Sequence, residues 1–66
     1  MRLTINGEPH DHPDGITLQA LLGGIGLDAR KVAVERNREI VPKSQYGDVV
    51  LAEGDALEIV HFIGGG

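Results

Sequence analysis

The sequence predicts an α+β domain in which one main helix packs on one face of a mixed sheet of about five strands. Short segments with alternating apolar and polar residues occur near both ends of the chain, and one amphipathic helical segment stands between them. Gly, Asn, Asp and Pro mark the boundaries between these segments. The resulting order of two strands, a helix and three further strands is typical of a helix layer on a sheet layer.

The first two strands form a predicted hairpin. Residues 1–6 alternate between apolar and polar side chains, which is the period of a half-buried strand. Asn6-Gly7 predicts a type I′ turn, because both central residues of that turn need a positive φ. A second strand is expected over 8–11. It belongs at an edge of the sheet, because Pro9 has no N–H to donate to a neighbouring strand.

The helix follows a Pro-Asp-Gly turn. Thr17 suits the N-cap, because its hydroxyl can accept a hydrogen bond from an early backbone N–H of the helix. The next apolar residues have the i, i+3, i+4, i+7 spacing of one helical face, and they are Leu18, Leu21, Leu22 and Ile25. Glycines at 23, 24 and 26 then end the helix. A phosphate-binding loop would open a helix rather than close it, so these glycines do not indicate a phosphate site.

Three more strands are predicted in the second half of the chain. Their expected ranges are 31–36, 39–41 and 56–63. Asn37-Arg38 is expected to form a tight turn between the first two, and Pro42 ends the second. The stretch 43–51 is irregular, with one helical turn around 44–46. No repeat or linker divides the chain, so we expect a single domain over 1–63 and a flexible glycine tail over 64–66.

Size and composition exclude several classes of function. A chain of 66 residues has room for a small core but not for a deep substrate pocket, so we expect a protein that is not an enzyme. A formal net charge of −4 disfavours nucleic-acid binding, which needs a basic surface. The chain has no cysteine for disulfides or thiolate metal sites. No apolar run suits a signal peptide or a membrane span, so we expect no membrane association and a cytoplasmic location.

The last strand is apolar on both faces. Leu57 and Ile59 share one face with His61, and we expect this face to join the core. Val60 and Phe62 share the other face, which a single helix cannot also cover. An exposed apolar patch on a small protein usually marks a partner site, so we interpret both residues as partner-binding. The alternative is that the irregular stretch 43–51 folds over this face and buries them.

The chain finishes with three glycines, Gly64, Gly65 and Gly66, directly after the last predicted strand. Four residues from Ile63 onward reach at most about 10–14 Å, and a backbone without side chains could pass through a narrow channel. The Gly66 carboxylate would then arrive in the active site of another protein. Adenylation gives this carboxylate a good leaving group that a sulfur nucleophile can displace. The alternative is a frayed terminus without function.

The histidines provide a weaker signal. His10 and His12 fall on one face of the predicted strand and have carboxylates nearby. A metal site needs a full ligand set, and spacing alone fixes no third ligand, so we do not predict metal binding here. His61 is expected to be a packed or partner-facing residue, because no pocket is evident that would hold a substrate beside it.

Several segments of the chain together resemble the ThiS family, the sulfur-carrier proteins of thiamine thiazole biosynthesis. The segments are 32–37 (VAVERN), 39–42 (EIVP), 53–55 (EGD) and 57–66 (LEIVHFIGGG). The resemblance extends over the whole chain. It implies a β-grasp, or ubiquitin-like, fold. A terminal Gly-Gly alone is weakly specific, because ubiquitin-like modifiers share it, whereas the combination of these segments is strongly specific.

The resemblance also implies a reaction cycle carried out by partners. The E1-like enzyme ThiF would adenylate Gly66 with ATP and magnesium, so the chain itself would bind no cofactor. A cysteine desulfurase pathway would supply the sulfur, and the resulting thiocarboxylate would donate it to the thiazole synthase ThiG. Gly65 would be the companion residue that passes the partner's channel, and Gly64 matches a position where the family varies.

Three other functions remain open. The small subunit of molybdopterin synthase uses the same tail chemistry, although the segment 37–42 favours the thiamine branch. A ubiquitin-like protein modifier would form isopeptide bonds to lysines. A plain interaction module would not use the tail at all.

Overall fold

The computed structural model describes residues 1–62, which form five strands, one α-helix and two short 3₁₀ turns. In chain order they are β1 (Arg2–Ile5), β2 (Glu8–Asp11), α1 (Leu18–Gly24), η1 (Ala29–Lys31), β3 (Val32–Arg36), β4 (Glu39–Val41), η2 (Lys43–Gln45) and β5 (Ala56–His61). The predicted α+β class and the order of elements are confirmed. The predicted boundary between domain and tail lies outside the described residues.

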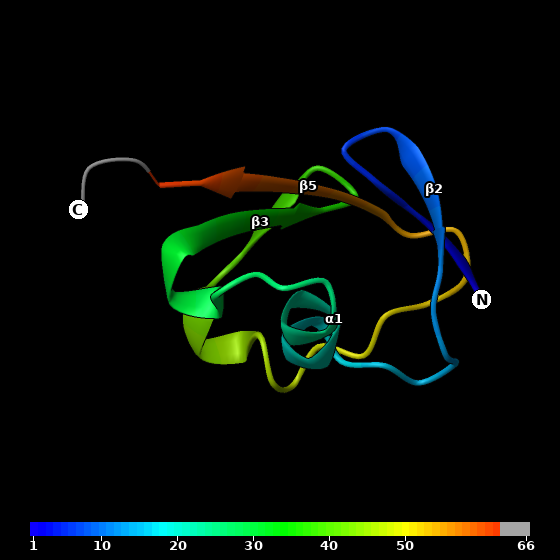
Figure 1. Ribbon diagram of the computed structural model, residues 1–66, viewed down its shortest axis with the longest axis horizontal. Coiled ribbons are helices and arrows are strands. Elements are labelled where there is room, and N and C mark those ends of the chain that lie inside the picture. Colours follow the sequence, from blue (N-terminus) through cyan, green and yellow to red (C-terminus); the bar gives the residue numbers. More distant parts are fainter. Residues whose placement is uncertain (63–66) are drawn as a thin grey trace.

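The five strands make one mixed sheet in the order β2-β1-β5-β3-β4. The central strands β1 and β5 are parallel, and the other neighbours are antiparallel. Pro9 lies on β2, at an edge of the sheet as predicted. Figure 1 shows α1 on one side of β3 and β5, so the sheet has an inner face toward the helix and an opposite face, here called the open face.

The core lies between the inner face and α1, and it includes residues from the irregular stretch. Its buried apolar side chains are Leu3, Ile5, Leu18, Leu21, Leu22, Val32, Val34, Val41, Tyr46, Leu51 and Leu57. The stretch that holds Tyr46 and Leu51 is hydrogen-bonded to the start of the helix, where Gln19 N donates to the Tyr46 carbonyl at 2.9 Å. Val60 and Phe62 remain 60% and 51% exposed, so the alternative in which this stretch buries them is wrong, although Lys43 at its start contacts the Phe62 ring.

Both ends of α1 have the predicted caps. Thr17 accepts a hydrogen bond from Ala20 N at 3.1 Å. At the other end Leu27 N donates to the Leu22 carbonyl at 2.9 Å, and Gly26 adopts a φ of +84°. This is the glycine-dependent Schellman arrangement. The helix has only 7 residues, and no helix within residues 1–62 has the length and apolar content to cross a bilayer.

Both predicted turns are present, and each hairpin turns on a pair of residues with positive φ, which was predicted for Asn6-Gly7. The values are 51° and 82° for Asn6 and Gly7, and 51° and 72° for Asn37 and Arg38. A type I′ turn favours this geometry because its twist matches that of the flanking strands. Glycine adopts it without strain, whereas Arg38 carries a Cβ that makes a positive φ unfavourable.

The two turn asparagines also hold the central strand. The Asn6 amide accepts from Ile59 N at 2.8 Å and donates to the Ile59 carbonyl at 3.2 Å, as a neighbouring strand would. The Asn37 amide accepts from Ala56 N at 2.9 Å. Side chains of both turns therefore hold β5 in place. The turn sequences could not predict these contacts, because β5 lies far along the chain from both turns.

We expect the substitution Arg38→Gly to stabilise the protein by about 0.5–1 kcal/mol, because it removes the Cβ strain while the turn keeps its shape. Urea unfolding followed by circular dichroism measures this as a higher midpoint at unchanged slope. Arg38→Ala is the matched control, because it shortens the side chain and keeps the Cβ. A similar gain in both variants would show that the backbone conformation is not the cause.

Candidate functional site

The predicted chemical site, Gly64, Gly65 and Gly66, lies outside the described residues. The structure therefore describes the point from which this segment leaves the domain. β5 ends at His61, at the end of the molecule opposite the N-terminus (Figure 1). We refer to Phe62 and its contacts as the tail root.

Three contacts hold the tail root. Phe62 N donates a hydrogen bond to the Lys31 carbonyl at 2.9 Å, which extends the pairing of β5 with β3 by one residue. The Lys43 ammonium lies 4.3 Å from the centroid of the Phe62 ring. The same ammonium donates to the Arg30 carbonyl at 2.8 Å. Phe62 is half exposed, as predicted, and one charged side chain covers part of its ring.

The short turn η1 that provides these carbonyls is itself capped. Asp28 accepts from Arg30 N at 2.9 Å and pairs with the Arg30 guanidinium at 2.9 Å. The hydrogen bond from the Arg30 side chain lowers the pKa of Asp28 to about 2. The Asp28 carboxylate is therefore ionised at neutral pH, and it keeps the cap of η1 in place.

We expect Lys43→Met to free the Phe62 ring with a loss of stability of no more than about 1 kcal/mol, because cation–π contacts at exposed sites are weak. The chain contains one Phe, so its aromatic NMR signals report this ring alone. They should shift in Lys43→Met and stay in place in the control Lys31→Met, which alters an exposed lysine of η1. Unchanged ring signals in both variants would contradict the contact.

The open face carries the other predicted site residue, Val60. Its side chain is 60% exposed, and it lies opposite Ala33 of β3. Ile40 of β4 is 78% exposed and lies opposite Glu35, so it belongs to the same face. The sequence predicted the strand that holds Ile40 but not its orientation, because a strand of three residues has no readable alternation.

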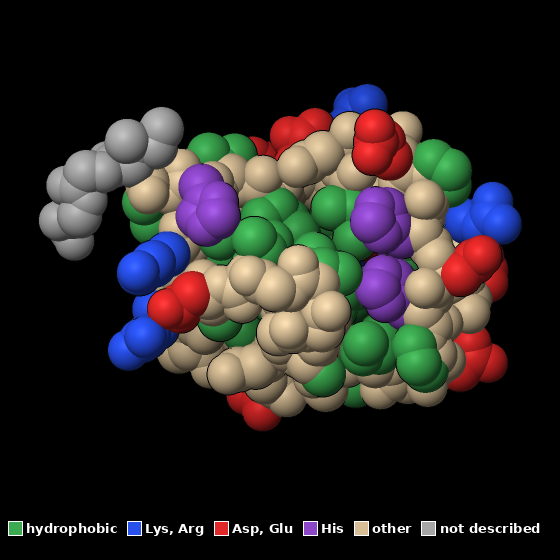
Figure 2. Space-filling model, viewed as in Figure 1, with side chains coloured by type: hydrophobic (Ala, Val, Ile, Leu, Met, Phe, Trp, Pro, Cys, Tyr) green, Lys and Arg blue, Asp and Glu red, His purple; other side chains and the backbone are tan. Residues whose placement is uncertain are grey.

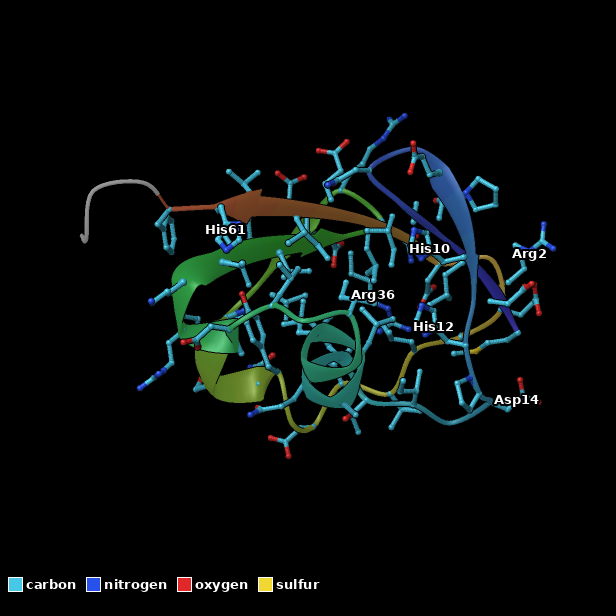
Figure 3. All side chains as sticks on the ribbon, viewed as in Figure 1. Arg2, His10, His12, Asp14, Arg36 and His61 are labelled. Carbon is cyan, nitrogen blue, oxygen red and sulfur yellow. The ribbon has the colours of Figure 1, made fainter. Side chains whose placement is uncertain are left out.

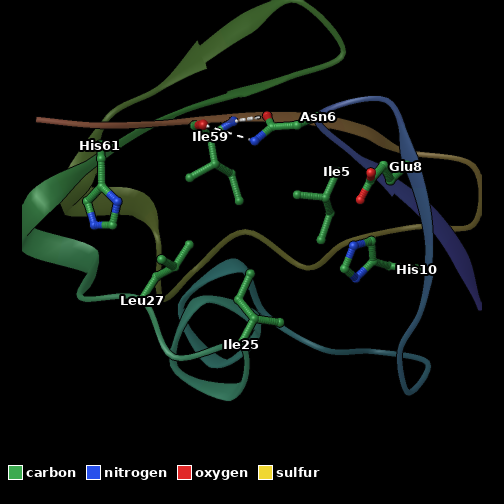
Figure 4. A pocket seen from close by; sticks show the side chains of 8 residues that line it. All are labelled: Ile5, Asn6, Glu8, His10, Ile25, Leu27, Ile59 and His61. Carbon is green, nitrogen blue, oxygen red and sulfur yellow. Dashed lines mark hydrogen bonds between the residues drawn. The ribbon is translucent and has the colours of Figure 1, made fainter.

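A shallow pocket opens on the inner face, where α1 is too short to cover the sheet. Figure 2 shows apolar side chains in this hollow with histidines on either side. The pocket has a volume of about 370 Å³, and its lining residues are Ile5, Asn6, Glu8, His10, Ile25, Leu27, Ile59 and His61. In Figure 4, His61 lies at one end of the pocket and His10 at the other, so the two imidazoles do not converge on one ligand position.

His10 of β2 and His12, which follows the end of that strand, lie side by side rather than around a metal position (Figure 3). The rings of His10 and His12 are parallel, with centroids 5.8 Å apart. Within residues 1–62 no three His, Cys, Asp or Glu side chains are grouped so that they could hold a metal ion.

Comparisons with known proteins agree on one family. The model of the ThiS family matches residues 3–66.

The chain belongs to the ThiS family.

A thiazole synthase of Paramagnetospirillum magneticum is 61% identical over the whole chain, which spans about 20% of that protein. The sulfur carrier protein ThiS of Bacillus subtilis is 50% identical over 76% of each chain. The crystal structure of the thiamine biosynthesis protein ThiS from Geobacter metallireducens matches over all of both chains with a TM-score of 0.83 and 33% identity. The β-grasp fold predicted from the sequence is thereby confirmed.

In this ThiS family chain one buried acidic residue fixes the start of β5. Asp55 accepts hydrogen bonds from Arg36 Nε at 2.8 Å, Ala52 N at 2.8 Å and Asn37 Nδ2 at 3.0 Å. Burial by itself raises the pKa of Asp55, but the hydrogen bonds from these three donors outweigh burial and lower the pKa. The sequence indicated Asp55 only as part of a turn, because its side-chain partners Arg36 and Asn37 are distant in the chain.

Proposed function

We propose that this chain is a sulfur carrier for thiamine thiazole synthesis and that the carboxylate of Gly66 is its working group. The observation that carries the proposal is the match of the ThiS family model up to residue 66, which includes the three glycines. The relative from Bacillus subtilis is named a sulfur carrier protein. The chain is not itself a catalyst in this proposal; an E1-like enzyme of the ThiF type acts on it and uses ATP and magnesium.

Both proposed steps take place at the terminal carboxyl group of Gly66. A carboxylate oxygen of Gly66 attacks the α-phosphorus of ATP, the bond to pyrophosphate breaks, and an acyl adenylate forms. Sulfide then attacks the acyl carbon; a carbon–sulfur bond forms, AMP leaves with the electron pair of the carbon–oxygen bond, and one proton goes to solvent. No electrons are gained or lost. The product is a thiocarboxylate, in which the sulfur atom is covalently bound to the carboxyl carbon of the last residue.

The described part of the chain supports this chemistry by presenting the tail. Asn6 and Asn37 hold β5 in the centre of the sheet, and Phe62 N is bonded to the Lys31 carbonyl where the strand ends. These hydrogen bonds therefore hold β5 in place as far as Phe62. Val60 on the open face and Phe62 at the tail root supply apolar surface for the partner that receives the tail.

Two partners follow from the proposal. Thiazole synthase is supported as the sulfur acceptor, because two relatives that contain the equivalent of this whole chain are named thiazole synthase, at 61% and 54% identity. We propose that a cysteine desulfurase pathway donates the sulfur and that the protein works in the cytoplasm.

The proposal is tested by intact mass after incubation with ATP, magnesium, the adenylating enzyme and sulfide. We expect a mass gain equal to the exchange of one oxygen for one sulfur. A thiocarboxylate mass in protein purified from its own cells would show that the chain carries the transferred sulfur there. Conjugates on lysines would instead indicate a protein modifier, and rescue of a thiamine-requiring strain by a chain without Gly65 and Gly66 would rule out the carrier.

We expect Gly65→Val to lower the rate of adenylation by roughly 100-fold, because a branched side chain misplaces the carboxylate in the partner's channel. Circular dichroism should be unchanged, since the substitution lies beyond the buried core. The control is Gly47→Ala, whose added Cβ would meet only the end of the Gln19 side chain, at 3.7 Å. An equal loss of adenylation in the control would contradict a specific role for Gly65.

A further inference from the structure

The tip of the first hairpin combines two groups that can react with each other. The side-chain carboxamide of an asparagine is an electrophile toward the backbone nitrogen of the next residue. A glycine at that next position leaves the nitrogen unshielded, because it has no Cβ. The chain has one Asn-Gly pair, Asn6-Gly7, and both residues are exposed. Within residues 1–62 Gly7 N donates no hydrogen bond, so the nucleophile of this reaction is free.

The electrophile, in contrast, is held by the central strand. The Asn6 amide accepts a hydrogen bond from Ile59 N at 2.8 Å and donates one to the Ile59 carbonyl at 3.2 Å (Figure 4). Both partners are backbone atoms of β5, so they restrain the carboxamide at its oxygen and at its nitrogen. The side chain must break these two hydrogen bonds before it can turn toward Gly7 N.

The second hairpin provides an internal comparison. Asn37 also has a positive φ in a two-residue turn, and its amide accepts from Ala56 N of β5 at 2.9 Å. The residue that follows it is Arg38, whose side chain shields the backbone nitrogen. Asn6 is therefore the asparagine of this chain at which we expect the reaction first.

We propose that Asn6 is a site of spontaneous deamidation and that its hydrogen bonds to β5 control the rate. Gly7 N attacks Cγ of Asn6 and loses its proton; a carbon–nitrogen bond forms, the bond from Cγ to Nδ2 breaks, and ammonia leaves with that proton. Water then opens the cyclic succinimide at Cγ, which gives aspartate, or at the backbone carbonyl carbon, which gives isoaspartate. One water is consumed, one ammonia is released, and no electrons are gained or lost.

Either product weakens the hold of the first turn on β5. Aspartate keeps the acceptor for Ile59 N, but it places a carboxylate oxygen where the amide donor faced the Ile59 carbonyl. Isoaspartate adds a carbon atom to the backbone, so a two-residue turn can no longer keep Ile5 opposite Glu8. The parallel pairing of β1 with β5 covers only two residue pairs, so loss of the Asn6 contacts loosens the centre of the sheet.

The site is tested by incubating the chain at mildly alkaline pH, folded and unfolded in urea, followed by intact mass and peptide mapping. We expect a mass gain equal to the exchange of an amide NH₂ for OH, located at Asn6, while Asn37 stays intact. The folded chain should react roughly tenfold or more slowly, because the side chain is released only by local opening. Equal rates in both states would overturn the control by β5, and equal reaction at Asn37 would overturn the assignment to Asn6.

The variant Arg38→Gly tests the role of the following residue, because it gives Asn37 the same neighbour as Asn6. In the unfolded variant both asparagines should deamidate at similar rates. An Asn37 that stays intact in this variant would contradict the chemistry proposed for the Asn-Gly pair.

The structural consequence is tested with Asn6→Asp, which has the side chain of one product. We expect a lower urea midpoint and a roughly tenfold faster hydrogen exchange of Ile59 N–H, because the link to β5 opens more often. Gln45→Glu is the matched control, since it makes the same amide-to-carboxylate change at an exposed residue of η2. A midpoint and an Ile59 exchange rate equal to those of the control would show that the product does not loosen β5.

Discussion

Replacing Asp55 with alanine is expected to lower the free energy of unfolding by about 3 kcal/mol. The carboxylate accepts three hydrogen bonds from Arg36, Ala52 and Asn37, and it is 6% exposed. Its removal leaves the Nε of the partly buried Arg36 guanidinium and the backbone N–H of Ala52 without their acceptor. A domain of this size has a total stability of about 3–10 kcal/mol, so the variant should melt at a much lower temperature and be almost fully unfolded at the melting midpoint of the wild type.

The pH dependence of stability gives a second measurement of the same site. The pKa of Asp55 is lowered in the folded protein, so the folded state favours the ionised form. Its contribution is fully present above the unfolded value of 3.8 and is lost as the pH falls through the lower folded pKa. As the pH falls below that value, the Asp55→Ala variant should therefore lose less of its free energy of unfolding than the wild type does.

The control for Asp55 is Asp48→Ala, which removes an exposed carboxylate of the same stretch. We expect a change within about 0.5 kcal/mol, as for most surface substitutions. Thermal and urea unfolding at neutral pH measure both variants. Equal stabilities for the two would mean that the hydrogen bonds to Asp55 do not hold the start of β5.

Replacing Tyr46 with alanine is expected to cost about 3–5 kcal/mol, because it opens a large cavity in a small core. The side chain is 1% exposed, and its hydroxyl donates to the Val32 carbonyl at 3.1 Å. Tyr46→Phe keeps the volume and removes only the hydroxyl, so it should cost about 1 kcal/mol. Urea unfolding compares the two, and a similar cost for both would show that packing of the ring contributes little.

Tyr46 also predicts a change at high pH. Burial raises the pKa of its hydroxyl above the usual 10.0. A raised pKa in the folded state means that this contribution to stability is present below pH 10.0 and is lost as the pH rises toward the folded value. Tyr46→Phe should remove this loss of stability, which unfolding experiments on both proteins across that pH range would detect.

The features that the sequence predicted well are those specified by neighbouring residues. Asn6-Gly7 predicted the first turn, and Pro9 predicted the edge strand. Thr17 and Gly26 predicted the two ends of the helix. In each case the residue acts on backbone within a few positions of itself. The resemblance of the chain to a known family supplied the fold as a whole.

The features that the sequence did not predict depend on contacts between distant segments. Tyr46 stands in an irregular stretch without periodicity, yet it fills the core. The ammonium of Lys43 reaches the Phe62 ring only after the fold brings η2 beside the end of β5. The exposure of Val60 could be predicted because β5 is long enough to place it on the face opposite Leu57, which a single helix cannot also cover. Strand β4 was too short to show on which face Ile40 lies. The three terminal glycines stay a prediction, because they lie outside the described residues.

The central position of β5 has a consequence for how the molecule is made. β5 is the last strand in chain order, yet it separates β1 from β3, so without residues 56–61 the remaining strands form two unconnected hairpins. Pairings between such distant segments form slowly and late. While the ribosome still holds these residues in its exit tunnel, the sheet cannot close. A chain halted early would therefore never become a competent acceptor for sulfur.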